Sequence, residues 1–470
     1  MIFNSVAFIL FAAAFFMILP LIYSRRTVKY LFIVLASFGF YAFWDFRFIF
    51  LFVVIGLVDY SIGLAIQRYP KMGKGWLVIS ISNTLIWLIL FKYSNFFASN
   101  IDAILRLVHL NARVQYRLPE FMLIGPVGLS FYTFMSMSYV VETYRGQIKA
   151  TRNPLQYLAY LSFFPHLMCG PIIRPKDLLS KLGEKIISTE GQRWEAIVLI
   201  SHGFFKKVVL ADNFAPIVNQ AFANPQLNPS GIYWWLIMVF FAAQIYCDFS
   251  GYSDIARGLF KAMGYDIPLN FDHPYISSSL REFWQRWHIS LSTWFRDYVY
   301  IPMGGSKLSS FKTYRNLWIT FLLSGIWHGA AWHFVIWGGL HALYLSIERL
   351  TRWPLMLEKL SLGKIVGLVL TLVQVIVAWV FFRAVDFSQA TSILGRMFTD
   401  LSWNGGIARF PLVLLLVLIL REGFIYVSSQ KKLQLAFLHW KPVQELTIAL
   451  LLTVAVYWRG PGNVFIYFQF

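Results

Sequence analysis

Charged residues and cysteines are both scarce in this 470-residue chain. Only 13% of the residues are charged and 58% are hydrophobic, a balance that excludes an ordinary soluble globular protein. The two cysteines, Cys169 and Cys247, lie far apart in apolar surroundings and form no CxxC spacing. The sequence therefore predicts two buried thiols, with neither a disulfide framework nor a cysteine metal site.

Familiar catalytic motifs are also missing. The chain has no GxSxG nucleophile elbow, Walker loop, HExxH zinc motif or GxGxxG dinucleotide motif. No histidine is followed five positions later by aspartate, which excludes the HxxxxD site of glycerolipid acyltransferases. His328 and His333 are five residues apart, on different helix faces, and make a poor metal site. We expect no metal ion and no bound cofactor.

What the chain does contain is a series of long apolar runs. We count about eleven spans, with two or three re-entrant or interfacial pieces, and predict an all-α integral membrane protein. The runs lie near 5–24, 30–44, 48–66, 75–98, 120–142, 154–172, 195–222, 231–261, 363–384, 409–428 and 445–458. Because no fixed-period repeat or long linker interrupts them, we predict one domain over residues 1–470.

The net charge of +19 comes mostly from basic residues between the apolar runs. The positive-inside rule accounts for this excess, so we predict the lipid bilayer as a partner and no nucleic acid. No basic residue precedes the first run, whereas Arg25, Arg26 and Lys29 follow it. Since a signal peptide shows the reverse order, we expect an uncleaved span with the N-terminus outside.

The stretch 281–341 contains two Trp-His pairs, which end at His288 and His328. Forty residues of unbroken helix would separate these histidines by ~60 Å. Pro302 and Gly304 interrupt the chain between them. The second histidine can therefore fold back toward the first, and we take the two as the centre of the function.

The first pair belongs to a polar stripe, if residues 281–296 form one helix. Five polar side chains then lie within about 80° of one another: Arg281, Gln285, His288, Ser292 and Arg296. One interpretation is an amphipathic helix that lies in the membrane interface with this face in water. The other is a cavity in which the arginines bind an anion beside His288.

The second pair lies among small residues. These are Ser324, Gly325, Gly329, Ala330 and Ala331. Gly325 and Gly329 form a GxxxG pattern, which is typical of close helix packing and also leaves room for a ligand near an imidazole. A histidine in an apolar span is a candidate functional residue, and the alternative for His328 is a hydrogen bond to a backbone carbonyl. His341 and Glu348 are expected to pair structurally.

Acidic and basic residues also occur together within apolar runs. Asp248 and Asp254 flank a glycine, which suggests a broken helix that lines a cavity. Asp254 and Arg257 are spaced to neutralise each other. Lys206 and Lys207 either mark a cytoplasmic helix end or contact a phosphate, and their pattern does not decide between these interpretations.

At these residues the chain resembles the membrane-bound O-acyltransferase family, in particular its bacterial branch. Six ordered blocks carry the resemblance: 130–148, 163–175, 203–213, 246–258, 283–305 and 324–342. The family's near-invariant histidine corresponds to His328, and its second polar position corresponds to His288.

The resemblance implies a helical fold around a central tunnel or funnel, with a catalytic core at about 120–350. It implies acetyl-CoA as the acyl-donor substrate, His328 as general base and His288 as an assistant that orients the thioester or polarises its carbonyl. The expected donor-binding side chains are Arg281, Gln285, Ser292, Arg296, Trp327 and Asp254, together with the loop 174–185.

The resemblance also implies a bacterial inner-membrane protein, so the N-terminus that the charge pattern places outside would be periplasmic. Its expected partners are a periplasmic acetyltransferase and an exopolysaccharide complex, with an alginate-like polymer as acceptor. Peptidoglycan O-acetylation and teichoic acid D-alanylation are alternatives. From other classes, a secondary transporter would show inverted repeats, which we do not find, and a non-catalytic scaffold would tolerate loss of both histidines.

Overall fold

The computed structural model describes residues 1–110, 114, 119, 125–227, 230–403, 406–431, 440–463, 465 and 466. Every regular element among these residues is a helix, which confirms the all-α prediction. The chain divides into two compact units. The first comprises Met1–Ile197 with Ile255–Pro268, and the second Val198–Asp254 with Leu269–Phe470. The prediction of one domain stays a prediction.

The helices of the first unit, in chain order, are α1 (Val6–Ile22), α2 (Arg26–Asp45), α3 (Arg47–Arg68), η1 (Pro70–Met72), α4 (Gly73–Leu88), η2 (Ile89–Tyr93), α5 (Ser94–Leu107), α7 (Leu129–Tyr144), α8 (Pro154–Ser162), α9 (Phe164–Leu167), α10 (Pro175–Leu178) and η4 (Lys181–Gly183). Two further helices, α11 (Glu190–Phe204) and α13 (Gly231–Ala262), contribute residues to both units.

The helices of the second unit are η5 (Phe205–Ala211), α12 (Asp212–Ala223), η6 (Pro225–Leu227), η7 (Pro274–Ile276), α14 (Leu280–Arg286), α15 (Ile289–Phe295), η8 (Arg296–Tyr300), α16 (Ser310–His328), α17 (Trp332–Thr351), α18 (Trp353–Leu357), α19 (Gly363–Arg383), α20 (Phe387–Thr399), α21 (Arg409–Lys431) and α22 (Lys441–Tyr457).

Six helical segments are long and apolar enough to cross a membrane, judged over the described residues. They are Arg26–Asp45, Arg47–Arg68, Pro70–Leu107, Gly231–Ala262, Gly363–Arg383 and Arg409–Ser428. The apolar helix Val6–Ile22 is shorter. The predicted count of eleven is therefore not confirmed, and residues 120–124 of one predicted run lie outside the described residues. Exposed apolar side chains such as Leu21, 83% exposed, and Phe50, 77% exposed, suit contact with lipid.

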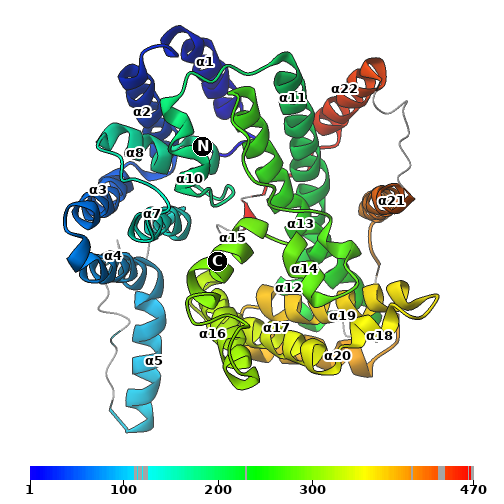
Figure 1. The fold of residues 1–470 in the computed structure, drawn as a ribbon. Helices are drawn as coiled ribbons and strands as arrows, with labels where there is room; N and C mark the ends of the chain where they lie inside the picture. Colours follow the sequence, from blue (N-terminus) through cyan, green and yellow to red (C-terminus); the bar gives the residue numbers. More distant parts are fainter. Residues whose placement is uncertain are drawn as a thin grey trace. The chain divides into compact units, whose positions relative to one another are not determined.

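A buried carboxylate joins three helices of the first unit. Asp59 of α3 is fully buried and accepts hydrogen bonds from Ser80 of α4 at 2.7 Å and Ser136 of α7 at 2.5 Å. These three helices pack side by side (Figure 1). Interhelical hydrogen bonds of this kind hold helices together where no water competes. Asp59 therefore serves the packing of the first unit.

Helices α16 and α17 of the second unit pack closely against each other (Figure 1). A Cβ atom added at Gly325 would lie 2.3 Å from the carbonyl oxygen of Phe334, and one added at Gly338 would lie 2.3 Å from that of Phe321. The predicted close packing at Gly325 is confirmed. Gly329 lies just beyond the end of α16, where an added Cβ would meet the Phe334 ring.

This packing predicts opposite effects for two neighbouring glycines of α17. Gly338→Ala places a methyl group against backbone and should lower the free energy of unfolding by about 1–3 kcal/mol. At Gly339 an added Cβ has only ordinary contacts, 3.8 Å or more, with Leu322 and Trp318. Gly339→Ala should raise stability by up to about 1 kcal/mol through helix propensity. Thermal unfolding in detergent measures both, and equal effects would contradict the close-packing account.

Candidate active site

The chain breaks at His288, between α14 and α15. His288 has φ 43° and ψ 53°, a left-handed conformation that is uncommon for a residue with a side chain. The prediction of one continuous helix over residues 281–296 is therefore wrong. Arg281, Gln285 and Arg296 are exposed and Ser292 is half-buried, whereas His288 is fully buried.

Asn270 supplies the physical reason for this break. Its backbone carbonyl accepts a hydrogen bond from the Ile289 N–H at 2.9 Å. Its side-chain oxygen accepts from the backbone N–H of Ser290 at 3.2 Å and from the hydroxyl of Ser290 at 2.9 Å. The first N–H groups of α15 are thus bound from outside the helix, which offsets the unfavourable backbone angle at His288.

The imidazole of His288 lies among aromatic rings. Its ring centroid is 4.6 Å from that of Phe249 and 6.2 Å from that of Phe271. Its Nδ1 lies 3.2 Å from Oδ1 of Asn270. Burial in this apolar setting lowers the pKa of His288 to about 3, so the ring is neutral at physiological pH.

His328 is the last residue of α16 and is 5% exposed. Its ring contacts Trp337 of α17 at 4.8 Å and Phe382 of α19 at 5.2 Å between centroids. Large aromatic groups thus approach the imidazole where the sequence alone showed small residues.

The indole of Trp327 joins the two histidines. Its centroid lies 6.4 Å from that of His288 and 5.0 Å from that of His328, and both contacts are edge-on. The distance between the two imidazole centroids therefore cannot exceed the sum of these two distances. The prediction that the second histidine folds back toward the first is confirmed. Among the described residues no three His, Cys, Asp or Glu side chains are placed to hold a metal ion.

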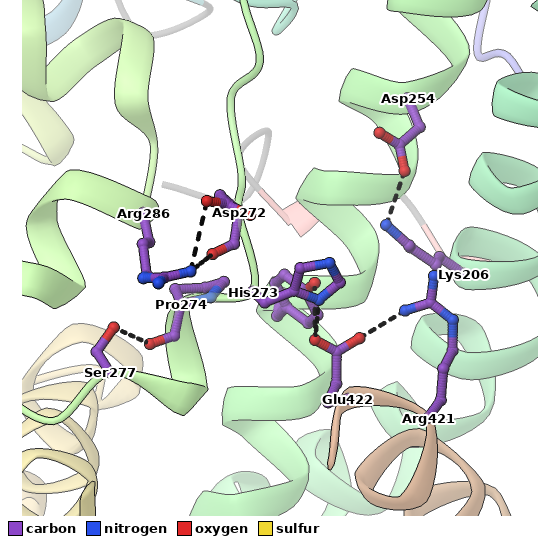
Figure 2. A network of polar contacts seen from close by, with 10 residues as sticks. Lys206, Asp254, Asp272, His273, Pro274, Ser277, Arg286, Arg421 and Glu422 are labelled. Carbon is purple, nitrogen blue, oxygen red and sulfur yellow. Dashed lines mark hydrogen bonds and ion pairs between the residues drawn. The ribbon is translucent and has the colours of Figure 1, made fainter. Parts of the chain in front are cut away.

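Lys206 and Lys207 both bind carboxylates. Nζ of Lys206 forms an ion pair with Asp254 (Figure 2), and the two polar atoms are 2.7 Å apart. Nζ of Lys207 lies 2.8 Å from Asp212 and 2.8 Å from Asp248. The two lysines of η5 therefore neutralise Asp248 and Asp254, the two acidic residues that lie within an apolar run of the sequence.

The buried pair of Lys207 and Asp248 also binds the C-terminal segment of the chain. Nζ of Lys207 donates to the carbonyl of Asn463 at 3.1 Å, and Asp248 accepts from the N–H of Ile466 at 2.8 Å. Between them, Phe465 packs on Phe249, whose ring contacts His288. The carboxylate network therefore fixes the aromatic wall behind His288.

Glu348 does not pair with His341 as expected. Its carboxylate accepts hydrogen bonds from the backbone N–H groups of Leu280 at 2.8 Å and Arg281 at 3.3 Å, at the start of α14. A carboxylate is favourable at a helix N-terminus because the first N–H groups lack partners within the helix. His341 packs instead on the rings of Trp284 and Trp337.

A second polar cluster lies near the start of η7. His273 binds Glu422 of α21, whose other oxygen accepts from Arg421 at 2.6 Å (Figure 2). Arg286 binds the carbonyl and carboxylate of Asp272 in the same region. This cluster holds the loop that carries Asn270.

Sequence reasoning missed Asn270, Trp337, Phe382 and the C-terminal segment. Asn270 lies in a loop rich in proline and aromatic residues, where nothing in the spacing indicates a partner 18 residues away. The aromatic residues resemble any others in a chain with 19% aromatic content.

One protein-family model matches most of the chain, and several acyl-transferring enzymes are similar to it. Residues 38–385 match the membrane-bound O-acyltransferase family. The chain is 38% identical over 412 residues to the probable alginate O-acetylase AlgI of Pseudomonas putida, covering 86% of this chain and 81% of the relative. It is 34% identical to the peptidoglycan O-acetyltransferase of Helicobacter pylori, over 78% of this chain and 73% of that protein. It is 30% identical to the teichoic acid D-alanyltransferase of Streptococcus thermophilus, over 48% of this chain and 57% of that protein.

The buried lysine predicts a large loss of stability on substitution. Lys207→Met leaves two carboxylates without their cation and should lower the free energy of unfolding by about 3–5 kcal/mol. Lys261→Met is the matched control, because Lys261 pairs with Glu195 and Asp266, which are 52% and 63% exposed. Lys261→Met should lower the free energy of unfolding by only about 0–1 kcal/mol. Chemical unfolding in detergent measures both, and similar losses would contradict the buried-network account.

Proposed function

The chain belongs to the membrane-bound O-acyltransferase family, and we propose that it takes acetyl groups from cytoplasmic acetyl-CoA and passes them across the membrane to an exported polysaccharide. The observation that carries this proposal is the pair of buried histidines on one indole, His288 and His328. The chain is an O-acyltransferase and a multi-pass membrane protein. What we propose beyond this is the identity of the acetyl donor, the identity of the acceptor and the catalytic roles of the two histidines.

The reaction needs one proton acceptor. The acceptor hydroxyl oxygen attacks the thioester carbonyl carbon, a C–O bond forms and the C–S bond of acetyl-CoA breaks. The hydroxyl proton passes to an imidazole and then to the leaving thiolate, so that the products are an acetyl ester and CoA. Imidazole suits this role because it can take up and release a proton near neutral pH.

His328 is the general base in this proposal, and His288 assists by orienting the thioester or polarising its carbonyl. Support comes from the position of His328 as the last residue of α16, since the carbonyl end of a helix favours the positive charge that a base acquires. Trp327, which touches both rings, forms a wall for the acetyl group.

The donor is held through its phosphates in this proposal. Arg281 and Arg296 are exposed, and guanidinium groups bind phosphate oxygens in a bidentate manner. Gln285 is exposed on α14, Ser292 lies half-buried on α15, and both can add hydrogen bonds. Asp254 already binds Lys206, so we assign it to orienting that lysine toward the donor.

The cytoplasmic face is the end of α2 that carries Lys29. Nζ of Lys29 donates to the backbone carbonyl of Glu184 at 2.9 Å, so the basic loop 174–185 lies at the same end of the first unit as Arg25 and Arg26. Basic residues concentrate on the cytoplasmic side of a membrane. We therefore propose that loop 174–185 faces the cytoplasmic donor and that the N-terminus is periplasmic.

An alginate-like exopolysaccharide is the favoured acceptor. The relative with that activity in its name matches 86% of this chain, against 78% for the peptidoglycan enzyme and 48% for the D-alanyltransferase. We propose a separate periplasmic acetyltransferase as partner within an exopolysaccharide complex. Peptidoglycan O-acetylation is the second candidate, and quantifying acetyl esters in both polymers of a deletion strain separates the two.

The catalytic assignment predicts a large effect at His328 and a small one at its neighbour. His328→Gln removes the base and should lower the rate of acetyl transfer by about 10²–10⁴-fold. His333→Gln is the control, because Nδ1 of His333 binds the carbonyl of Phe381 on α19. Release of free CoA from radiolabelled acetyl-CoA in native membranes, at matched protein levels, measures both. Wild-type activity in His328→Gln refutes the assignment, and free passage of intact acetyl-CoA favours a transporter instead.

The topology predicts opposite labelling at the two ends of α2. Lys185→Cys should react with a membrane-impermeant maleimide in inverted vesicles only, whereas Phe46→Cys, at the other end, should react in intact cells. The native Cys169 and Cys247 are buried and give a low background. The reverse pattern would place the N-terminus in the cytoplasm.

A further inference from the structure

The side-chain oxygen of Asn270 receives three hydrogen bonds at one point. Its donors are the backbone N–H of Ser290, the hydroxyl of Ser290 and Nδ1 of His288, at 3.2, 2.9 and 3.2 Å. On the other side, Nδ2 of Asn270 donates to the hydroxyl of Ser253 on α13 at 3.2 Å. Asn270 is itself fully buried.

The orientation of this amide is fixed by the backbone. A backbone N–H can only donate, so the atom of Asn270 that faces Ser290 must be the oxygen. The same oxygen faces Nδ1 of His288, and an oxygen without a hydrogen can only accept. Nδ1 of His288 must therefore carry the proton.

A neutral imidazole has one N–H and one lone pair. With the proton on Nδ1, the lone pair is on Nε2. His288 is in the neutral form because its surroundings are apolar rings. The tautomer of this histidine is thus set by a residue that lies 18 positions earlier in the chain.

We propose that Asn270 is a positioning residue that holds His288 as its Nδ1–H tautomer, so that Nε2 of His288 meets the substrate as a hydrogen-bond acceptor. This role of Asn270 rests on the proposed acetyltransferase function, because it assumes that a substrate of that reaction meets Nε2. The tautomer itself rests only on the contacts of Asn270.

This tautomer restricts what His288 can do. Polarising a thioester carbonyl requires a donor, and neutral His288 has no N–H at Nε2 to give. An acceptor at Nε2 binds a hydroxyl or amide hydrogen of a substrate instead. Of the two assisting roles for His288, orientation of a substrate is the one that its protonation allows, while His328 remains the base.

A spectroscopic measurement tests the tautomer without reference to activity. The full-length protein labelled with ¹⁵N-histidine is reconstituted in lipid, and the signal of His288 is identified by its loss in His288→Gln. We expect the ¹⁵N shifts of a protonated Nδ1 and an unprotonated Nε2 at neutral pH. In Asn270→Leu, which has similar volume and no acceptor, we expect a mixture of tautomers. A protonated Nε2 in the wild-type protein would overturn the proposal, whether or not the chain uses acetyl-CoA.

Asn270→Asp and Asn270→Leu separate positioning from mere packing. Asn270→Leu should lower kcat for CoA release from acetyl-CoA in native membranes by about 10–100-fold and leave KM nearly unchanged. Asn270→Asp keeps the acceptor and adds a negative charge beside His288, which favours imidazolium. The ¹⁵N signal of His288 should therefore show imidazolium up to a pH about one unit or more higher in Asn270→Asp than in the wild-type protein. This pH profile is read from the spectrum, and activity should be retained where the ring is neutral.

The charged groups near His288 on neighbouring elements are the same in all of these variants. On α13, Asp248 adjoins Phe249 and binds Lys207, and on α16, His328 adjoins Trp327. A shift seen only in Asn270→Asp therefore reports the new carboxylate.

Asn316→Leu is the matched control. Asn316 of α16 is also fully buried and donates to the carbonyls of Met303 and Gly305. Its loss should lower thermal stability and leave the pH profile in place. Equal loss of activity in Asn270→Asp and Asn270→Leu, with an unshifted profile, would overturn the positioning role. Inactivity of the wild-type protein toward acetyl-CoA, with the expected ¹⁵N shifts, would instead overturn the proposed function alone.

Discussion

The hydrogen bonds of Asn270 are the interaction on which the rest of the site depends. They stop α14 and α15 from joining into one helix, and they hold His288 in a left-handed conformation. In a continuous helix the imidazole would lie on the same stripe as the exposed Arg281 and Arg296. With the break, it is buried against Trp327, and that indole also contacts His328. A single buried amide thus places one of the two histidines of the candidate site, where the sequence pattern alone suggested an interfacial helix.

The same physical constraint explains the other buried polar groups. Away from water, a polar side chain is destabilising unless another group binds it. Asp59 is bound by two serines, and Lys207 by two carboxylates and the C-terminal segment. These groups join helices. His288 and His328 lie instead against aromatic rings, those of Phe249 and Trp337, and perturbed titratable groups in such settings often mark functional sites.

Helix content and the meeting of the two histidines followed from sequence because both depend on local signals. Long apolar runs predict helices, and Pro302 with Gly304 predicts a turn that returns the chain. The exact span count and the break at His288 did not follow. The break depends on Asn270, which has no periodic relation to His288, and the helical wheel assumed the continuity that Asn270 prevents. The partners of Asp248 and Glu348 were likewise set by tertiary contacts between distant segments.

We propose above all that His288 and His328 act in one site. The most direct measurement compares acetyl transfer from radiolabelled acetyl-CoA in His288→Gln, His328→Gln and the double variant, in native membranes at matched protein levels. Residues that act as a unit show grossly non-additive losses. If the two histidines act in one site, the double variant should be within a few-fold of the slower single variant. Losses that multiply would mean that the two histidines act independently, and would contradict it.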